Sequence, residues 1–257
     1  MTDHDLKTFL DNKTLQFNNT NFITSDPISI PHQYTRKEDI EIAGFLAALL
    51  SWGQRKTIIA KSTALMSLMG NQPYLFLTQA AEKDYLPMAH FKHRTFTGDD
   101  CLGIMRGLSH MYLHNGGLEA VCTKGFEKEG AYGGVIALRK ALLESEHLKR
   151  TEKHLANPKA GSAAKRVNMF FRWMIRNDHA GVDFGLWKGV NPAQLVIPLD
   201  LHVGKSARHL GLLHRTQNDW QAAIELTEKL RSFDHQDPVK YDFALFGHSL
   251  FDRTKFD

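Results

Sequence analysis

The sequence predicts an all-α fold, and three observations support that prediction. Apolar residues recur at helical spacing through most of the chain, as in the stripe formed by Ile40, Ala43, Leu46 and Leu50. Glycine and proline stand between these segments, where they end helices. The one convincing β-like run, at residues 195–197, is too short to build a sheet.

Helix start and stop signals divide the chain into about nine helices. Acidic Glu38 and Asp39 favour a helix start, Ser162 is the expected N-cap of a later helix, and Asp237-Pro238 is typical of another helix start. The expected helices cover residues 38–52, 56–69, 99–114, 134–147, 163–175, 200–211, 218–231 and 238–250, with a further short one near Cys122.

Composition limits the class of protein. A formal net charge of +4 permits a polyanionic partner, although it equally fits a basic protein without one. The cysteines Cys101 and Cys122 are isolated, and no histidine spacing is typical of a metal site, so we expect neither metal nor cofactor. Without a signal peptide or a long apolar run, we expect no membrane partner and a cytoplasmic, nucleoid-associated location.

A turn of small residues leads into a helix at 161–168, Gly-Ser-Ala-Ala-Lys-Arg-Val-Asn. The N-terminus of a helix can hold a phosphate through its free N–H groups, and small residues let a DNA backbone approach closely. Lys165 falls in the first turn, where the helix dipole disfavours a positive charge. A lysine must be neutral to act as a nucleophile, so Lys165 is a candidate catalytic residue, or otherwise a plain surface lysine.

The second segment of interest is 197–203, Ile-Pro-Leu-Asp-Leu-His-Val. Its apolar flanks and Pro198 predict a rigid, partly buried approach to a helix that starts at Asp200. Such an aspartate is a good N-cap, and it could also be a carboxylate that stabilises a cationic transition state or activates a nucleophile. His202 is most simply a structural histidine beside the cap.

These two segments together resemble the helix-hairpin-helix DNA glycosylase superfamily. That family has a Gly-x-Gly hairpin with a lysine two residues later, and a Val-Asp-x-His helix start followed by an arginine- and leucine-containing stretch. Here Gly161 and Ala163 match the hairpin, Lys165 the lysine, and Asp200 with His202 the aspartate motif, followed by Arg-His-Leu-Gly-Leu at 208–212. The resemblance implies a helical bundle of two interlocked lobes within one compact unit, 1–257, with the hairpin and the Asp200 helix at about 155–212.

The resemblance also implies an activity. Members with both residues are glycosylase/lyases, so Lys165 would attack the sugar of a damaged, possibly oxidised purine nucleotide while Asp200 assists. The partner would be double-stranded DNA with a flipped base, bound by a monomer. Leu-Ser-Trp-Gly-Gln-Arg at 50–55 resembles the family segment that fills the hole left by the flipped base. The implied DNA-binding residues are Gly161, Ser162, Ala163, Arg166, His202, Gln54 and Arg55.

The chain also departs from the superfamily pattern. Lys159-Ala160 replaces the usual Leu-Pro before the hairpin, and Ala163 replaces its second glycine. The interval between Lys165 and Asp200 is long and contains Trp187, which is closer to the archaeal oxoguanine glycosylases. The strings Leu-Ser-Trp-Gly, Pro-Leu-Asp-x-His and Asp-Pro-Val-Lys-Tyr-Asp are also similar to those of a bacterial family of unknown function.

Two hypotheses follow from these patterns. The first is an enzyme in which Trp187 or Trp52 stacks on the flipped base, although tryptophans at helical spacing are more often core residues. The second is a non-catalytic DNA-binding module of the same fold. Convergence of Lys165 and Asp200 on one cleft would favour the enzyme, and their separation would favour the module.

Overall fold

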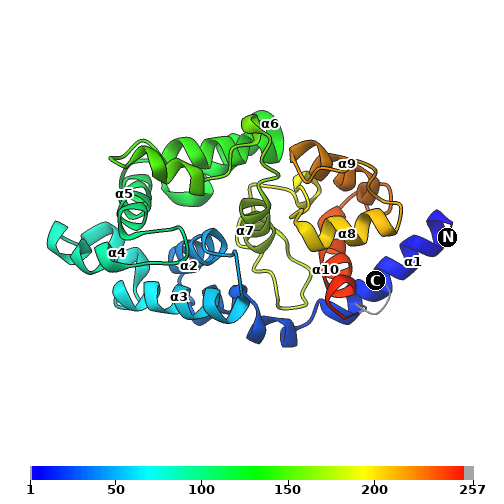
Figure 1. Ribbon diagram of the computed structural model, residues 1–257, viewed down its shortest axis with the longest axis horizontal. Helices are drawn as coiled ribbons and strands as arrows, with labels where there is room; N and C mark the ends of the chain where they lie inside the picture. The colour runs from blue at the N-terminus through cyan, green and yellow to red at the C-terminus, as the bar shows by residue number, and fades with distance from the viewer. Residues whose placement is uncertain (1, 252–257) are drawn as a thin grey trace. The chain divides into compact units, whose positions relative to one another are not determined.

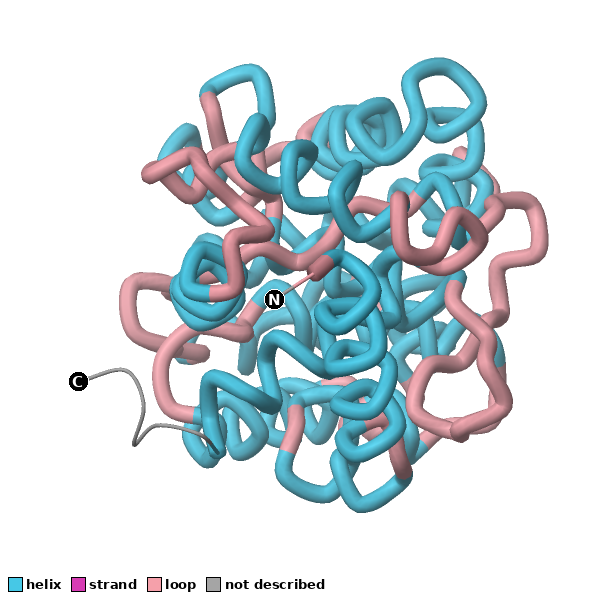
Figure 2. Tube along the Cα trace, turned by 90° about the vertical axis from the view of Figure 1, so that its right-hand side faces the viewer, coloured by secondary structure: helices cyan, strands magenta, loops and turns pink. Residues whose placement is uncertain are grey.

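The computed structural model describes residues 2–251, and the described part is entirely helical (Figure 1). Figure 2 shows helices and loops without a strand in this part of the chain, and two isolated β-bridges are its β-type pairings. The all-α prediction is therefore confirmed. Residues 195–197 are an extended segment between helices, because a run so short has no partner strand with which to pair.

The chain divides into two compact units. The middle unit runs from Ile23 to Ala156, and the terminal unit combines the residues up to Phe22 with those from Asn157 onward. Both segments singled out by the sequence, at 161–168 and 197–203, belong to the terminal unit. No helix among residues 2–251 is long and apolar enough to cross a bilayer.

The middle unit is built from five α-helices joined by short 3-10 turns. Its buried residues include Leu46, Leu65, Met105 and Phe126. The elements are η2 (Pro27–Ser29), η3 (Pro31–Gln33), α2 (Lys37–Leu49), α3 (Arg55–Leu68), α4 (Pro73–Gln79), η4 (Glu82–His90), α5 (Gly98–His114), α6 (Gly117–Leu142) and η5 (Lys149–His154), with η1 (Thr20–Ser25) at the boundary with the other unit.

Helix α6 differs from the prediction of a helix at 134–147. It begins at Gly117 and is interrupted at Glu129 and Gly130, whose backbone angles are not helical. Around that break Gly125 lies against the backbone of Gly133, where an added Cβ would come within 2.4 Å of the Gly133 carbonyl oxygen. The interruption was not predicted because the glycines that permit close backbone contact also end helices.

The terminal unit joins the two ends of the chain. Helix α1 (Asp3–Phe17) packs along α10 (Tyr241–Phe251), and α8 (Leu201–His209) packs on the same α10 (Figure 1). The remaining elements are η6 (Pro158–Ala160), α7 (Lys165–Ile175), η7 (Pro192–Gln194), α9 (Trp220–Arg231) and η8 (Pro238–Lys240). Helix α1 was not predicted, since its buried face consists of little more than Leu6 and Leu10.

The core of the terminal unit forms around α7. Phe170, Phe171 and Trp173 are fully buried on this helix, as predicted for its apolar face. The loop after α7 returns to its C-terminal end, where the N–H of Phe184 donates to the carbonyl of Trp173 at 2.8 Å. Rigid packing on both sides therefore fixes the orientation of α7 within the unit.

Candidate active site

The hairpin before α7 reverses the chain through two left-handed residues. Gly161 has φ +86°, and Ala164, which has a Cβ and so adopts this region less easily, has φ +51°. Ala164 occupies the N-cap position of α7, so the prediction of Ser162 as the N-cap is wrong. The Ser162 hydroxyl instead accepts a hydrogen bond from the Ala164 N–H at 3.2 Å, which satisfies a donor before the helix begins.

Backbone and side-chain hydrogen bonds hold this hairpin in place. The Trp220 N–H donates to the Gly161 carbonyl at 3.2 Å, and Asn168 Nδ2 donates back to the Ala163 carbonyl at 3.2 Å. Asp219, which pairs with Ser162 in a β-bridge, caps α9 by accepting from the Ala222 N–H at 3.0 Å. Gly161 and Ser162 themselves are exposed, whereas Ala163 is buried.

Asp200 is the N-cap of α8, as predicted. Its Oδ1 accepts hydrogen bonds from the N–H groups of His202 and Val203, both at 2.9 Å. Asn218 Nδ2 donates to the Asp200 carbonyl at 3.0 Å, which fixes the backbone of the cap from the other side. Because Oδ1 serves the helix, Oδ2 is the atom through which Asp200 meets other groups.

Lys165 and Asp200 face one another. Lys165 is the first residue of α7, and its Nζ lies 3.8 Å from Asp200 Oδ2. The two side chains are 28% and 23% exposed, so both are reachable from solvent. The Nζ also lies 3.7 Å from the sulfur of Met169, which is only a weak hydrogen-bond acceptor. The amine is thus held loosely, beside one carboxylate and one soft apolar group.

Further along the same face of α7 lies an arginine cluster, which we define as Arg172, Arg176 and the four carboxylates that contact them. Arg172 Nε lies 3.3 Å from Asp183 Oδ1, and Arg172 also pairs with Asp242 of α10. Arg176 lies 3.0 Å from Asp183, 2.8 Å from Asp237 and 2.6 Å from Asp178. Both arginines are almost fully buried.

Asp242 connects the arginine cluster electrostatically with the Lys165–Asp200 pair. Burial raises the pKa of Asp242 to about 6, and the positive charge of Arg172 opposes that rise. The negative charge of Asp200 also raises the pKa of Asp242, while the positive charge of Lys165 lowers it. The site therefore contains a third carboxyl group whose charge depends on the other two charged side chains.

Comparison with known proteins identifies a family for this chain. A family model described as "Protein of unknown function (DUF2400)" matches residues 26–251, which is most of the sequence. The chain belongs to this family. No curated protein and no solved structure matches the chain significantly. The matched part of this DUF2400 protein contains Lys165, Asp200 and Asp242.

Three further sequence candidates of the DUF2400 protein lie in the terminal unit. Arg166 and His202 are partly exposed, each one residue beyond the start of the helix that contains it. Trp187 is only 1% exposed and packs edge-on against Phe170, with ring centroids 5.4 Å apart. The interpretation of Trp187 as a base-stacking residue is not supported by this geometry, because the ring is enclosed in the core.

The other candidates lie in the middle unit. Gln54 is exposed at the N-cap of α3, and Arg55 follows it as the first residue of that helix. Trp52 is partly exposed and stacks on His154, with ring centroids 5.9 Å apart. His93 Nε2 lies 3.2 Å from the Trp52 carbonyl oxygen, so the Trp52 segment is anchored within this unit.

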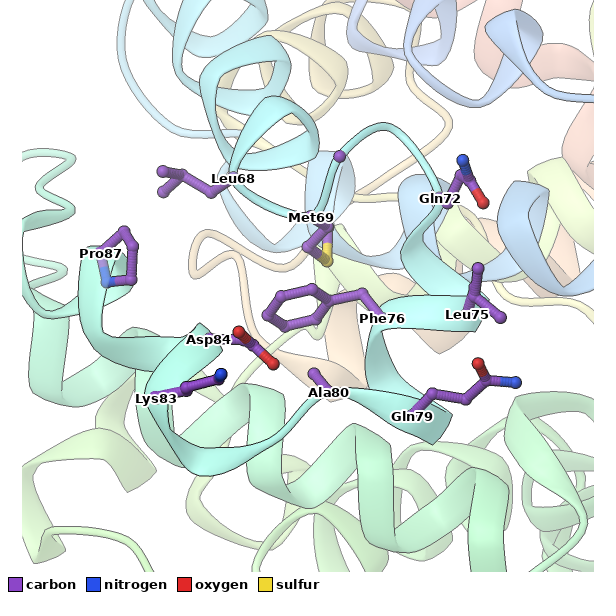
Figure 3. Close-up of a pocket in the computed structure, with 11 residues that line it drawn as sticks. Leu68, Met69, Gln72, Leu75, Phe76, Gln79, Ala80, Lys83, Asp84 and Pro87 are labelled. Carbon is purple, nitrogen blue, oxygen red and sulfur yellow. The ribbon is translucent and has the colours of Figure 1, made fainter.

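An open groove in the middle unit is lined by residues between 68 and 87, from the end of α3 through α4 and η4 (Figure 3). Phe76 extends into the groove. Its acidic residue, Asp84, accepts a hydrogen bond from the Ala81 N–H at 2.8 Å and so serves the start of η4. The groove thus has apolar walls, without a nucleophile beside a free base.

Sequence reasoning did not identify Met169, Arg172 or Asp242 as parts of the site. One signal was present: Arg172 stands seven residues after Lys165, which places both on one face of a helix. The sequence around Asp242 contains no such signal, since an aspartate in the first turn of a helix is ordinarily a solvent-exposed residue. Its burial beside Arg172 comes from the packing of α10 in the terminal unit.

Proposed function

We propose that this DUF2400 protein is a DNA glycosylase with lyase activity, which removes a damaged base through a Schiff base at Lys165. The proposal rests on the approach of Lys165 to Asp200, 3.8 Å apart at the starts of two helices. These residues are 35 positions apart in sequence, and each is the residue that the superfamily resemblance assigns to the reaction.

The environment of Lys165 supports a nucleophilic role. The first turn of α7 disfavours a positive charge, and the Met169 sulfur is a poor acceptor for an ammonium group. Both features ease loss of the proton that an amine must lose before it attacks carbon. In the proposed reaction the Lys165 nitrogen bonds to C1′ of the sugar, and the damaged base leaves with the electrons of its bond to C1′.

The surroundings of Asp200 fit the assisting role. Two backbone N–H groups hold Oδ1, so the carboxylate cannot swing away, and Oδ2 remains directed toward the Lys165 amine. A fixed carboxylate at this distance can stabilise positive charge that develops on the sugar as the base departs. The exposed hairpin at Gly161 and Ser162 would hold the DNA phosphate beside the reacting sugar.

The proposal is tested by trapping the covalent intermediate. Duplexes that each contain one lesion, with oxidised purines first, are incubated with the protein and sodium borohydride. We expect a protein–DNA adduct with at least one lesion, and we expect Lys165→Ala to abolish it. Lys159→Ala is the matched control, because that lysine lies in the turn before the hairpin. Absence of an adduct across the panel would overturn the nucleophilic role.

The alternative is a DNA-binding module without catalysis, and the hairpin geometry favours it. The turn is fixed by Trp220, Asn168 and Asp219, so its exposed backbone does not depend on Lys165. The module predicts salt-dependent duplex binding that Lys165→Ala leaves almost unchanged, with no adduct. Fluorescence anisotropy at two salt concentrations, run beside the trapping assay, separates the two functions.

A further inference from the structure

Asp242 lies where two differently built groups of charges meet. On one side Arg172 binds its carboxylate, and on the other the charges of Lys165 and Asp200 act on it. Its side chain is about 10% exposed. A buried carboxylate that only stabilised the fold would need its arginine alone, so its closeness to the reactive pair requires a separate explanation.

The arginine cluster contains more acid than base. Two guanidinium groups, of Arg172 and Arg176, face the carboxyl groups of Asp178, Asp183, Asp237 and Asp242. Burial in such an excess disfavours ionisation, and it raises the pKa of both Asp237 and Asp242. Of these two, Asp242 is the carboxyl on which the charges of Lys165 and Asp200 act most directly.

The other charges around α10 are engaged elsewhere. On α1, Asp11 lies 3.3 Å from Lys240 Nζ, and on η8 the carboxylate of Asp237 binds Arg176 at 2.8 Å. The groups that act on Asp242 are therefore Arg172 and Lys165 of α7, Asp183 of the following loop, and Asp200 at the cap of α8. Among them Arg172 is bound to Asp183 as well, which leaves Lys165 as the cation with the freest amine.

We propose that Asp242 is a positioning residue that sets the reactivity of Lys165, its carboxylate stabilising the ammonium form of the lysine and its neutral form releasing the amine. A negative charge nearby always favours the protonated amine. Arg172 holds the Asp242 carboxyl in a fixed place, so the effect on Lys165 depends on charge rather than on movement. The consequence for Schiff-base formation rests on the proposed function, but the coupling itself does not.

Measuring the reactivity of Lys165 without DNA tests the coupling. The full chain is treated with trace acetic anhydride across a range of pH, and acetylation of Lys165 is quantified by peptide mass spectrometry, with exposed Lys205 as the internal reference. In Asp242→Asn we expect half-maximal labelling of Lys165 at a pH lower by about 0.5, or roughly three-fold faster labelling below the midpoint. Asp178→Asn, which removes a carboxylate from Arg176, should leave the Lys165 profile unchanged.

A second measurement uses the unaltered protein, in case Asp242→Asn does not fold. The ¹³Cε signal of Lys165, assigned by comparison with Lys165→Arg, should show an inflection near pH 6, where Asp242 titrates. Identical labelling of a folded Asp242→Asn and the parent protein, or an Lys165 signal without that inflection, would overturn the role of Asp242.

The outcomes also separate this inference from the proposed function. A shifted labelling profile without any borohydride adduct would support the coupling and overturn the glycosylase. An adduct with an unshifted labelling profile would support the glycosylase and overturn the coupling. If both hold, the pH dependence of adduct formation should move in Asp242→Asn in the same direction as the labelling of Lys165.

Discussion

The two ends of α7 carry positive charge in opposite ways. At the C-terminal end, Arg172 and Arg176 are buried and contact carboxylates of Asp178, Asp183, Asp237 and Asp242. At the N-terminal end, Lys165 is partly exposed and meets one carboxylate at 3.8 Å. One helix therefore holds two cations whose charge is fixed and one whose charge can change.

The chemistry of the two residue types matches this difference. A guanidinium group stays protonated in proteins and offers several donors in a rigid fork, which suits a permanent multidentate cluster. An amine can lose its proton when its surroundings allow it. The comparison indicates that the arginine end stabilises the terminal unit and that the lysine end is available for reaction.

Removing the most strongly held cation should have the largest effect. Arg176→Met leaves three carboxylates in contact with no replacement charge, and we expect a loss of about 3–5 kcal/mol in the free energy of unfolding. Lys165→Ala is the matched change at the other end and should cost less than about 1 kcal/mol. Urea unfolding followed by circular dichroism measures both, and equal losses would contradict the distinction between the two ends.

Asp242 should make stability depend on pH in an unusual direction. Its pKa is about 6 in the folded protein against an ordinary 3.8, so the folded state binds the proton more tightly than the unfolded state. Its contribution therefore favours folding at low pH and is lost as pH rises from about 4 to 6, by roughly 3 kcal/mol for about two pH units.

The difference in unfolding free energy between the parent protein and Asp242→Asn isolates this contribution, because all other acids are common to both. Asp219, whose hydrogen bonds with Arg215 lower its pKa to about 2, acts in the opposite direction below pH 4 and cancels in the difference. We expect the difference to change by roughly 3 kcal/mol between pH 4 and 7. A difference that stays constant with pH would contradict the raised pKa.

The smallest expected change in stability separates the two roles of Asp200. Asparagine caps helices as well as aspartate does, so Asp200→Asn should keep the cap and lose the negative charge. Asp200→Ala should lose both and cost about 1 kcal/mol. If Asp200 serves the reaction, both variants lose the borohydride adduct although only one loses stability. An active Asp200→Asn would reduce Asp200 to a cap.

Local patterns predicted the starts of α7 and α8, because caps and apolar spacing are written in neighbouring residues. The approach of Lys165 to Asp200 came only from the superfamily resemblance, since no local pattern brings together residues 35 positions apart. The structure then supplied the distance. It also corrected the N-cap of α7, where a left-handed Ala164 replaces the expected Ser162.

Burial in irregular segments was the least predictable property. Trp187 stands among glycines in a segment without periodicity, so its sequence gave no sign that the ring fills the core. The expected helix from Pro238 begins as the 3-10 turn η8, and α10 follows from Tyr241. Asp237 heads that turn without capping it, because its Oδ2 is bound to Arg176.

The broken helix α6 has a consequence for the order in which the chain folds. Gly125 and Gly133 are eight residues apart, so closing the segment between them costs little conformational entropy. The terminal unit, in contrast, must bring α1 to α10 from opposite ends of the sequence. Because local contacts form faster than distant ones, we expect the α6 hairpin to be an early structure and the closure of the terminal unit to limit the folding rate.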